Sequence, residues 1–217
     1  MKKRSVVTAI LGCTVLVFAG CAIAAANGRF PWNNLKWQTD SGEAVAAYVN
    51  GEPILQKTVD KTAKNARLIN EVMARLFSPK PKSYSESEVL DGLIKAKVLE
   101  QEAKKEGITV TDEDALNTLH KTDRQVQDLL KNGSEDEKEN AKETLDTMNS
   151  VVSALHETMD EYEKEIAPSE RNILIQGRLY QKYVSEHSSL TRTERQMWED
   201  YVSELMKKAD VKRANGV

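Results

Sequence analysis

Cysteine is almost absent from this sequence. Of 217 residues only Cys13 and Cys21 are cysteines, and both lie in the apolar N-terminal segment. This distribution excludes a disulfide in the body of the protein, so the fold must be held by packing. The histidines His120, His156 and His187 stand far apart and show no Cys/His spacing typical of zinc sites. We therefore interpret each histidine as a surface residue and expect no metal and no other cofactor.

Motifs of common enzyme sites are missing too. The sequence has no G-x-S-x-G pattern, no phosphate-binding loop and no zinc-binding pattern. We interpret the acidic residues Asp160, Glu161, Glu163 and Glu165 as a solvated helix face. The chain has 31 Lys and Arg against 34 Asp and Glu, a formal net charge of −3, which gives no support for nucleic-acid binding. We predict no catalytic residue and no nucleic-acid partner.

Charge is absent from a long N-terminal stretch. After three basic residues at positions 2–4, no charge occurs from Ser5 to Gly28, which is the arrangement of an export signal. Residues 17–21, Val-Phe-Ala-Gly-Cys, resemble the lipobox of bacterial lipoproteins, in which the signal is cut before the cysteine and Cys21 carries lipid. Two alternatives are cleavage by an ordinary signal peptidase near residues 24–26, and retention of the run as an anchor, since about 20 residues span a bilayer. All three place the body outside the cytoplasmic membrane, and the leading interpretation places it on the extracytoplasmic face of the cell membrane.

The rest of the chain divides into a tether and one domain. Residues 1–21 form the signal or anchor segment. Residues 22–43 contain Gly, Pro, Asn and Ser with scattered Trp, a composition that predicts a tether. Residues 44–217 are enough for a single domain with a substantial core.

A short hairpin is predicted at the start of this domain. Asn50-Gly51 stands between short apolar flanks, and both residue types accept the positive φ angles of a tight hairpin turn. Pro53 restricts the second arm to a sheet edge because it cannot donate a ladder hydrogen bond. Residues 209–214 are the only late segment with extended character. We therefore expect this tail to pair with residues 47–49 and to join the two ends of the domain.

Most of the remaining sequence predicts helices. Apolar residues from Val59 to Leu76 recur in steps of three and four. Ser85 and Glu88 form a capping box, and Gly107 fits the left-handed position after a helix end. Another helix is expected from Thr111, and a capping box at residues 191–194 is expected to begin the last one. The fold class is therefore mainly α, with a small β element.

A heptad pattern covers residues 141–166. Apolar residues are separated alternately by four and three positions, which indicates a helix seam. The pattern predicts one helix from Ser134 to about Ile166, ended by Pro168, with Ser169 capping the next helix. We expect this seam to pack in an intramolecular helical hairpin; the alternative is a homodimer through residues 141–166.

Two segments resemble a known family. They are "AYVNGEPILQKTVD" at residues 47–60 and "VLDGLIKAKVLEQEAKKEGITVTDED" at residues 89–114. Their motifs and order resemble the N-terminal chaperone domain of SurA and of the PrsA-type foldases, in which a strand is followed by two helices and a G-I-x-V-(T/S)-D-E-E link. The closing "WEDYVSELMKKADVK" is similar to the final helix of that family, which completes the N-terminal module. The resemblance implies a helical chaperone module.

Most such relatives also carry a parvulin-type prolyl isomerase domain of about 90 residues, rich in Gly and Phe. Here only 24 residues separate Ile166 from Thr191, and the whole chain has ten Gly and three Phe with no Gly-Gly pair. We therefore predict a membrane-tethered chaperone that binds unfolded or partly folded exported proteins and has no isomerase chemistry. The alternatives are a prolyl isomerase and a coiled-coil scaffold of the cell envelope.

Client-binding residues are predicted from side-chain type. An adaptable binding surface needs exposed apolar groups, and the flexible thioether of methionine suits varied partners. The alternative is that these residues fill the core, which is the more common role of a methionine on a helical stripe. On this basis the candidates are Met73, Leu76, Met148, Met159, Met197 and Trp198.

Overall fold

The computed structural model describes residues 38–77, 84–187 and 193–214. Six helices and three strands lie within these ranges. In chain order they are β1 (Val45–Val49), β2 (Glu52–Leu55), α2 (Gln56–Phe77), α3 (Glu86–Lys105), α4 (Asp112–Asn132), α5 (Glu135–Leu155), α6 (Met159–Glu186), α7 (Glu194–Lys208) and β3 (Val211–Arg213).

The predicted hairpin and its pairing with the tail are confirmed. Asn50 and Gly51 both have positive φ angles, 49° and 85°, as a tight turn between β1 and β2 requires. The sheet order is β2-β1-β3, with both neighbours antiparallel to β1. Tyr48 is opposite Lys212. Pro53 lies in β2, an outer strand of this sheet, where its missing N–H does no harm.

Several helices begin at a capping residue whose side chain accepts a hydrogen bond from the first turn. The Ser85 side chain accepts from the Glu88 N–H, and the Glu88 carboxylate accepts from the Ser85 N–H. Gly107 follows α3 with a φ of 73°. Thr193 caps α7 together with Gln196, so the predicted box at residues 191–194 is displaced by two positions; residues 191 and 192 lie outside the described ranges.

The single helix predicted from Ser134 to Ile166 is wrong. Helix α5 ends at Leu155, and His156 adopts a left-handed conformation with a φ of 60°. Thr158 then caps α6 through Glu161. The heptad spacing hid this break because α5 and the start of α6 both contribute apolar residues to one cluster. The Thr-x-x-Glu capping box at Thr158 was the local sequence feature that marked the new helix.

Pro168 does not end a helix, and Ser169 does not cap one. Both residues lie inside α6, which continues to Glu186. A proline at this depth removes one backbone hydrogen bond and favours a bend. Helix α6 packs against α3 and α4, and tertiary packing can outweigh the local cost of a proline in a helix.

Two hydrophobic clusters support the region around α2. The first lies beneath the sheet and includes Val49, Val59, Leu90 and Ile94, none more than 1% exposed. The second joins α2, α5 and α6 and consists of four buried residues, Val72, Val151, Val152 and Tyr162. The heptad seam therefore packs within its own chain.

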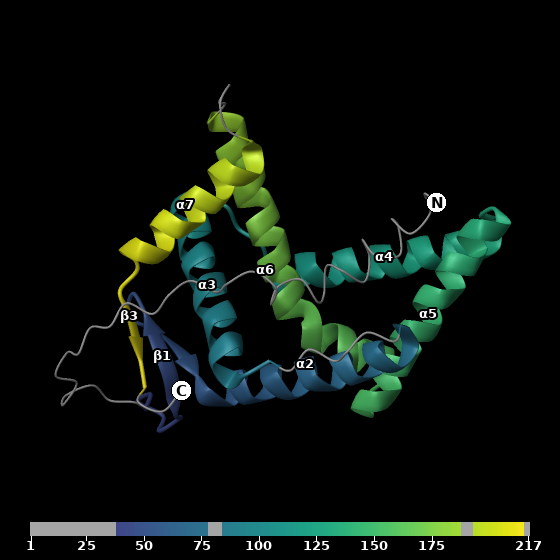
Figure 1. Cartoon of the computed structure of the whole chain (residues 1–217), viewed down its shortest axis with the longest axis horizontal. Helices are drawn as coiled ribbons and strands as arrows, with labels where there is room; N and C mark the ends of the chain where they lie inside the picture. The colour runs from purple at the N-terminus through teal and green to yellow at the C-terminus, as the bar shows by residue number, and fades with distance from the viewer. Residues whose placement is uncertain (1–37, 78–83, 188–192, 215–217) are drawn as a thin grey trace.

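The helices that carry these clusters are arranged openly rather than as one compact bundle. Figure 1 shows α2 running from the sheet toward α5, with α6 descending from α7 past the start of α4 toward α5, and α4 and α5 projecting together to one side. Helix α7 lies against the C-terminal part of α6 and leads back to β3. Leu99, Leu179 and Val202 form a further cluster that joins α3, α6 and α7. The C-terminal elements thus connect the far end of α6 to the first strand.

Candidate functional site: a groove between helices α2 and α6

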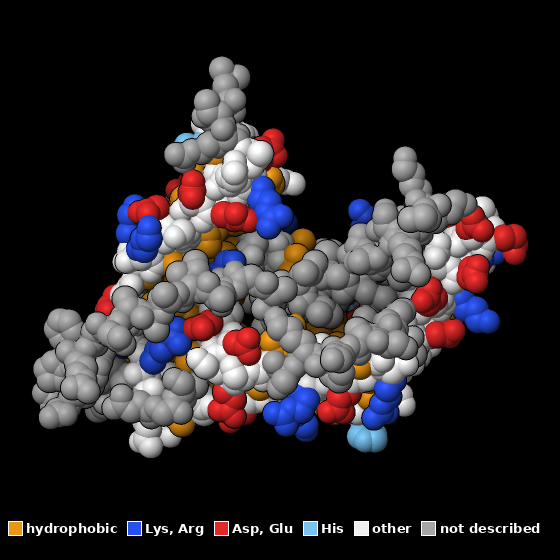
Figure 2. Space-filling view, in the orientation of Figure 1, with side chains coloured by type: hydrophobic (Ala, Val, Ile, Leu, Met, Phe, Trp, Pro, Cys, Tyr) orange, Lys and Arg blue, Asp and Glu red, His pale blue; other side chains and the backbone are white. Residues whose placement is uncertain are grey.

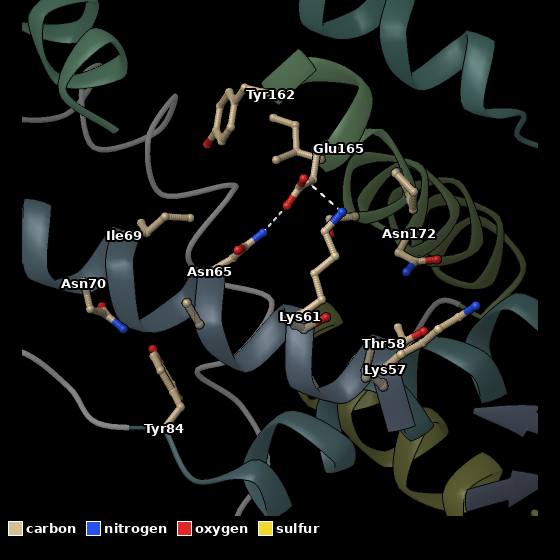
Figure 3. Close-up of a pocket in the computed structure, with 16 residues that line it drawn as sticks. Lys57, Thr58, Lys61, Asn65, Ile69, Asn70, Tyr84, Tyr162, Glu165 and Asn172 are labelled. Carbon is tan, nitrogen blue, oxygen red and sulfur yellow. Dashed lines mark hydrogen bonds and ion pairs between the residues drawn. The ribbon is translucent and has the colours of Figure 1, made fainter. Parts of the chain in front are cut away.

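A cavity of about 500 Å³ opens between α2 and α6. Helix α3 contributes Leu93 to its lining, and Tyr84 lies just before that helix (Figure 3). Its wall from α2 consists of Lys57, Thr58, Lys61, Thr62, Asn65, Ala66, Ile69 and Asn70. Its wall from α6 consists of Tyr162, Glu165, Ile166, Pro168, Ser169 and Asn172.

The apolar lining is anchored in both hydrophobic clusters. Tyr84 and Leu93 pack against the cluster beneath the sheet. Ile69 and Ile166 pack against the cluster formed by α2, α5 and α6, to which Tyr162 itself belongs. The groove therefore lies where the two clusters meet, and its apolar side chains are fixed from behind by packed residues.

An ion pair and a side-chain hydrogen bond connect the two walls of the groove. Lys61 Nζ lies 2.9 Å from Glu165 Oε2, and the Asn65 side-chain amide donates to Glu165 Oε1 (Figure 3). The Glu165 side chain is only 17% exposed, whereas that of Lys61 is 62% exposed. The contact thus fixes a half-buried carboxylate of α6 to the facing side of α2.

A second carboxyl group, from Glu157, lies against Glu165. Glu157 belongs to the connection between α5 and α6, and its Oε2 atom is buried with no hydrogen-bond partner among the described residues. Burial raises the pKa of Glu157, and the neighbouring carboxylate of Glu165 raises it further. Burial also acts to raise the pKa of Glu165, but hydrogen bonds from Lys61 and Asn65 outweigh it, so this pKa is lowered.

The same surroundings shift the pKa of the Tyr162 phenol. Burial, followed by the charges of Glu157 and Glu165, raises its pKa to about 12. Tyr162 therefore stays neutral at physiological pH and presents an aromatic ring to the groove.

The interpretation of residues 160–165 as a solvated face is wrong for two of its acids. Glu165 lies in the groove wall. Glu163 is 7% exposed, and its carboxylate lies 3.0 Å from Nε2 of His120 on α4. Sequence spacing gave no indication of this, because the packing of α4 against α6 decides which acids are covered. His120 is half exposed and has a specific partner that its sequence context did not predict.

The predicted site residues lie in several places. Cys21 lies outside the described residues, as do the side chains of Met73 and Leu76 near the end of α2. Met148 is half-buried on α5. Met159 packs against the cluster containing Tyr162.

The two predicted residues on α7 are distant in the fold from α2. Met197 is 8% exposed. Trp198 packs on the cluster joining α3, α6 and α7, and its ring makes an edge contact with Tyr180 at 5.5 Å between centroids. Of the four candidates with described side chains, none lines the groove.

Sequence reasoning missed the groove although it found part of its lining. Ala66 and Ile69 belonged to the apolar stripe of the first helix, and Tyr162 and Ile166 belonged to the heptad seam. Nothing in the sequence showed that these stripes leave a gap between them. Lys61 and Glu165 are 104 positions apart, and no pattern related them.

The surface and the described helices give two further results. Figure 2 shows acidic and basic side chains interspersed over the visible face, without a continuous basic area. Within residues 38–77, 84–187 and 193–214, no helix has both the length and the apolar character needed to cross a membrane, and no cluster of three or more His, Cys, Asp or Glu suits a metal ion. The predicted export segment lies outside these ranges.

These features define a mainly helical domain with a three-stranded antiparallel sheet and a partly apolar groove. The chain matches the family of SurA-like N-terminal domains over residues 1–176 and belongs to that family. This membership places it among chaperone-like foldases. Comparison with curated proteins and with solved structures finds no match.

Proposed function

We propose that the protein is a chaperone that holds segments of unfolded or partly folded exported proteins in the groove between α2 and α6. The observation that carries this proposal is the groove itself, an open cavity of about 500 Å³ with Ile69, Tyr84, Leu93, Tyr162 and Ile166 in its lining. Ligand pockets in proteins typically enclose about 300–1,000 Å³. The cavity is thus of a size to take a few side chains of an extended segment.

The chemistry of the lining suits clients of varied sequence. Apolar and aromatic side chains gain free energy from burying any apolar client group, with little dependence on its shape. Thr58, Ser169 and Asn172 add hydroxyl and amide groups at the same groove, and such groups can hydrogen-bond a client backbone. Holding a client in the groove needs no change of its peptide bonds, and we propose that the protein has no isomerase chemistry of its own.

Two parallel assays test this function. The full-length protein, in detergent micelles, should suppress the aggregation of a chemically unfolded test protein in proportion to its concentration. In the same buffer it should leave unchanged the cis/trans rate of an X-Pro peptide, which takes tens of seconds or longer without catalysis. Clear acceleration by the protein, absent from a mock purification, would favour the prolyl isomerase instead. Failure to suppress aggregation would contradict the proposed holding function.

We further propose that the domain is attached to the extracytoplasmic face of the membrane through lipid on Cys21, with residues 22–43 as the tether. Part of this tether contacts the domain: Gln38 forms a β-bridge with Ala44, and Glu43 pairs with Lys57. The support for attachment is the charge-free run ending at Cys21.

Replacement of Cys21 by Ala tests this attachment. The variant should lose all incorporation of radiolabelled fatty acid and should accumulate as uncut precursor or be shed from the membrane, because the thiol that carries lipid is gone. Replacement of Cys13 by Ala, within the same apolar run, should leave labelling intact. An unlabelled wild-type protein that stays in the membrane would indicate an uncleaved anchor.

A further inference from the structure

We propose that residues 29–37 of the tether lie in the groove between α2 and α6 and compete there with clients. These residues, Arg-Phe-Pro-Trp-Asn-Asn-Leu-Lys-Trp, are called the tether segment below. The competition with clients rests on the proposed function, but the position of the segment can be measured without a client. Cleavage before Cys21, cleavage near residues 24–26 and retention of the apolar run all leave the segment in the mature chain.

The described end of the tether lies at the start of α2, next to the groove. Gln38, the first described residue, forms a β-bridge with Ala44. The Ala44 carbonyl accepts from the N–H of Gln56, the first residue of α2, at 2.9 Å. The next residue, Lys57, lines the groove and pairs with Glu43. The tether segment is therefore joined to the domain at the end of the groove nearest the sheet.

The tether segment is long enough to extend along the whole groove. The α2 wall begins at Lys57 and ends at Asn70, a length of about 20 Å at 1.5 Å per residue. An extended chain of the length of the tether segment reaches at most about 30 Å. Pro31 favours such a conformation, because its ring fixes φ and restricts the preceding residue to extended backbone. From the Lys57 end the segment can thus reach Ile69, which Figure 3 shows toward the opposite end of the groove.

The tether segment is more apolar than a solvated spacer. Its large apolar residues are Phe30, Trp32, Leu35 and Trp37, and they include two of the three tryptophans of the whole chain. Flexible spacers are typically built from small and polar residues, whereas aromatic side chains gain much free energy from burial. The segment therefore favours an apolar surface. The groove lining offers one through Ile69, Tyr84, Leu93, Tyr162 and Ile166.

The charges of the groove wall are compatible with this occupant. The tether segment carries two positive charges and no negative one. The lysines of the lining, Lys57 and Lys61, are each paired with a carboxylate, that of Glu43 and that of Glu165. Because these pairs balance the positive charge of the wall, the groove has no excess of positive charge to repel the segment.

Attachment to the same chain favours the tether segment over a free client. A segment joined to its site by a short connection behaves as if it were present at about millimolar concentration, so weak contacts are enough to hold it. A client then finds the groove free for only a fraction of the time, and its apparent affinity is reduced by that fraction. The tether segment thus selects for clients whose apolar segments bind strongly enough to displace it.

Photocrosslinking within one chain, without a client, tests the position of the segment. Benzoylphenylalanine replaces Trp32 of the full-length protein in detergent micelles. About 20 Å of extended chain separates this position from Gln38, so the β-bridge alone does not hold it at the groove. Mass spectrometry of the monomer band should locate the crosslinks on α2 at positions 57–70 and on α6 at positions 162–172. The same group at Asn27, outside the segment, should give few crosslinks to these helices.

Client affinity is the second measurement, by fluorescence anisotropy of a labelled unfolded protein. A triple variant with Phe30→Ser, Trp32→Ser and Leu35→Ser keeps the length of the tether but removes three of its apolar side chains. For a groove that the segment fills about nine-tenths of the time, this variant should bind the client about tenfold more tightly than the parent. A control with Asn33→Ser and Asn34→Ser changes polar positions of the same segment and should bind like the parent.

Either of two results would overturn the proposal. One is a lack of crosslinks from position 32 to the groove walls, including crosslinks that fall instead on α7 or, in a dimer band, on a second copy of the chain. The other is a triple variant that binds the client no more tightly than the parent. Both leave the holding function standing if the parent suppresses aggregation. A protein that crosslinks its tether in the groove, but binds no client with or without the three serines, would contradict the holding function.

Discussion

Removal of residues 209–217 should lower the free energy of unfolding by about 3–5 kcal/mol, a large share of the roughly 5–15 kcal/mol that stabilises a typical domain. The deletion takes away β3 and leaves β1 without its neighbour. The Asn50 N–H donates to the Asp210 carbonyl at 2.8 Å, and the Ala214 N–H donates to the Ala46 carbonyl at 2.9 Å. Val211 also packs against the cluster beneath the sheet.

Loss of β3 would also expose residues that are buried in the intact domain. Ala46, Ala47 and Val49 are 0% exposed in the intact domain, so loss of β3 uncovers part of the core as well as backbone groups. Chemical denaturation of the full-length and shortened chains measures the difference, and a melting temperature lower by roughly 6–20 °C should accompany it. Removal of residues 215–217 alone leaves β3 intact and serves as the control. Equal stability of the long deletion and this control would show that β1 does not depend on β3.

The strand register gives a sharper check of the same architecture. Tyr48 and Lys212 are opposite each other, so cysteines at these two positions should oxidise to a disulfide in a chain whose native cysteines are replaced by Ser. Cysteines at Tyr48 and Val211 should not, because neighbouring residues of a strand face opposite sides of the sheet. The reverse preference would shift the register by one residue.

Filling the groove should strongly weaken client holding while the domain remains folded. Asn172 is half-buried on α6 and lines the groove across from Thr58 (Figure 3). In Asn172→Trp the indole occupies space that a client side chain would use. A buried client side chain contributes about 1.5–3 kcal/mol, so its exclusion should weaken binding roughly 10- to 150-fold.

The measurement is suppression of aggregation against chaperone concentration, with the melting temperature recorded for each variant. Gln181→Trp adds the same side chain to an exposed position on α6 that does not line the groove, and it should hold clients as the parent does. If both Trp variants fold and hold clients equally well, the groove is not the binding surface.

The parts of the fold that the sequence predicted depend on local chemistry. The Asn50-Gly51 turn and the Ser85 cap need only a few adjacent residues, so their patterns identified them. Pairing of β1 with the tail was also predicted, because residues 209–214 were the only late segment with extended character. A long-range contact can be inferred when so few partners exist.

The parts that were missed depend on how helices meet. The break at His156 was hidden because the same apolar spacing continues across it from α5 into α6. The burial of Glu163 and the bond between Lys61 and Glu165 arise from contacts between helices distant in the chain, and no periodicity encodes them. Ile69 and Ile166 were recognised as apolar, but only the packed structure shows that they line an open groove.

Site-specific photocrosslinking shows directly where on the domain a client binds. A photoreactive benzoylphenylalanine replaces Thr58, which is exposed and lines the groove, or Trp198 on α7, or the outward-facing Gln181 of α6. Each full-length protein is irradiated with an unfolded client, and the crosslinked client is quantified by mass spectrometry. We expect strong crosslinking from position 58 and little from positions 181 and 198. Crosslinking that is as strong from position 198, or from 181, as from 58 would contradict client binding in the groove between α2 and α6.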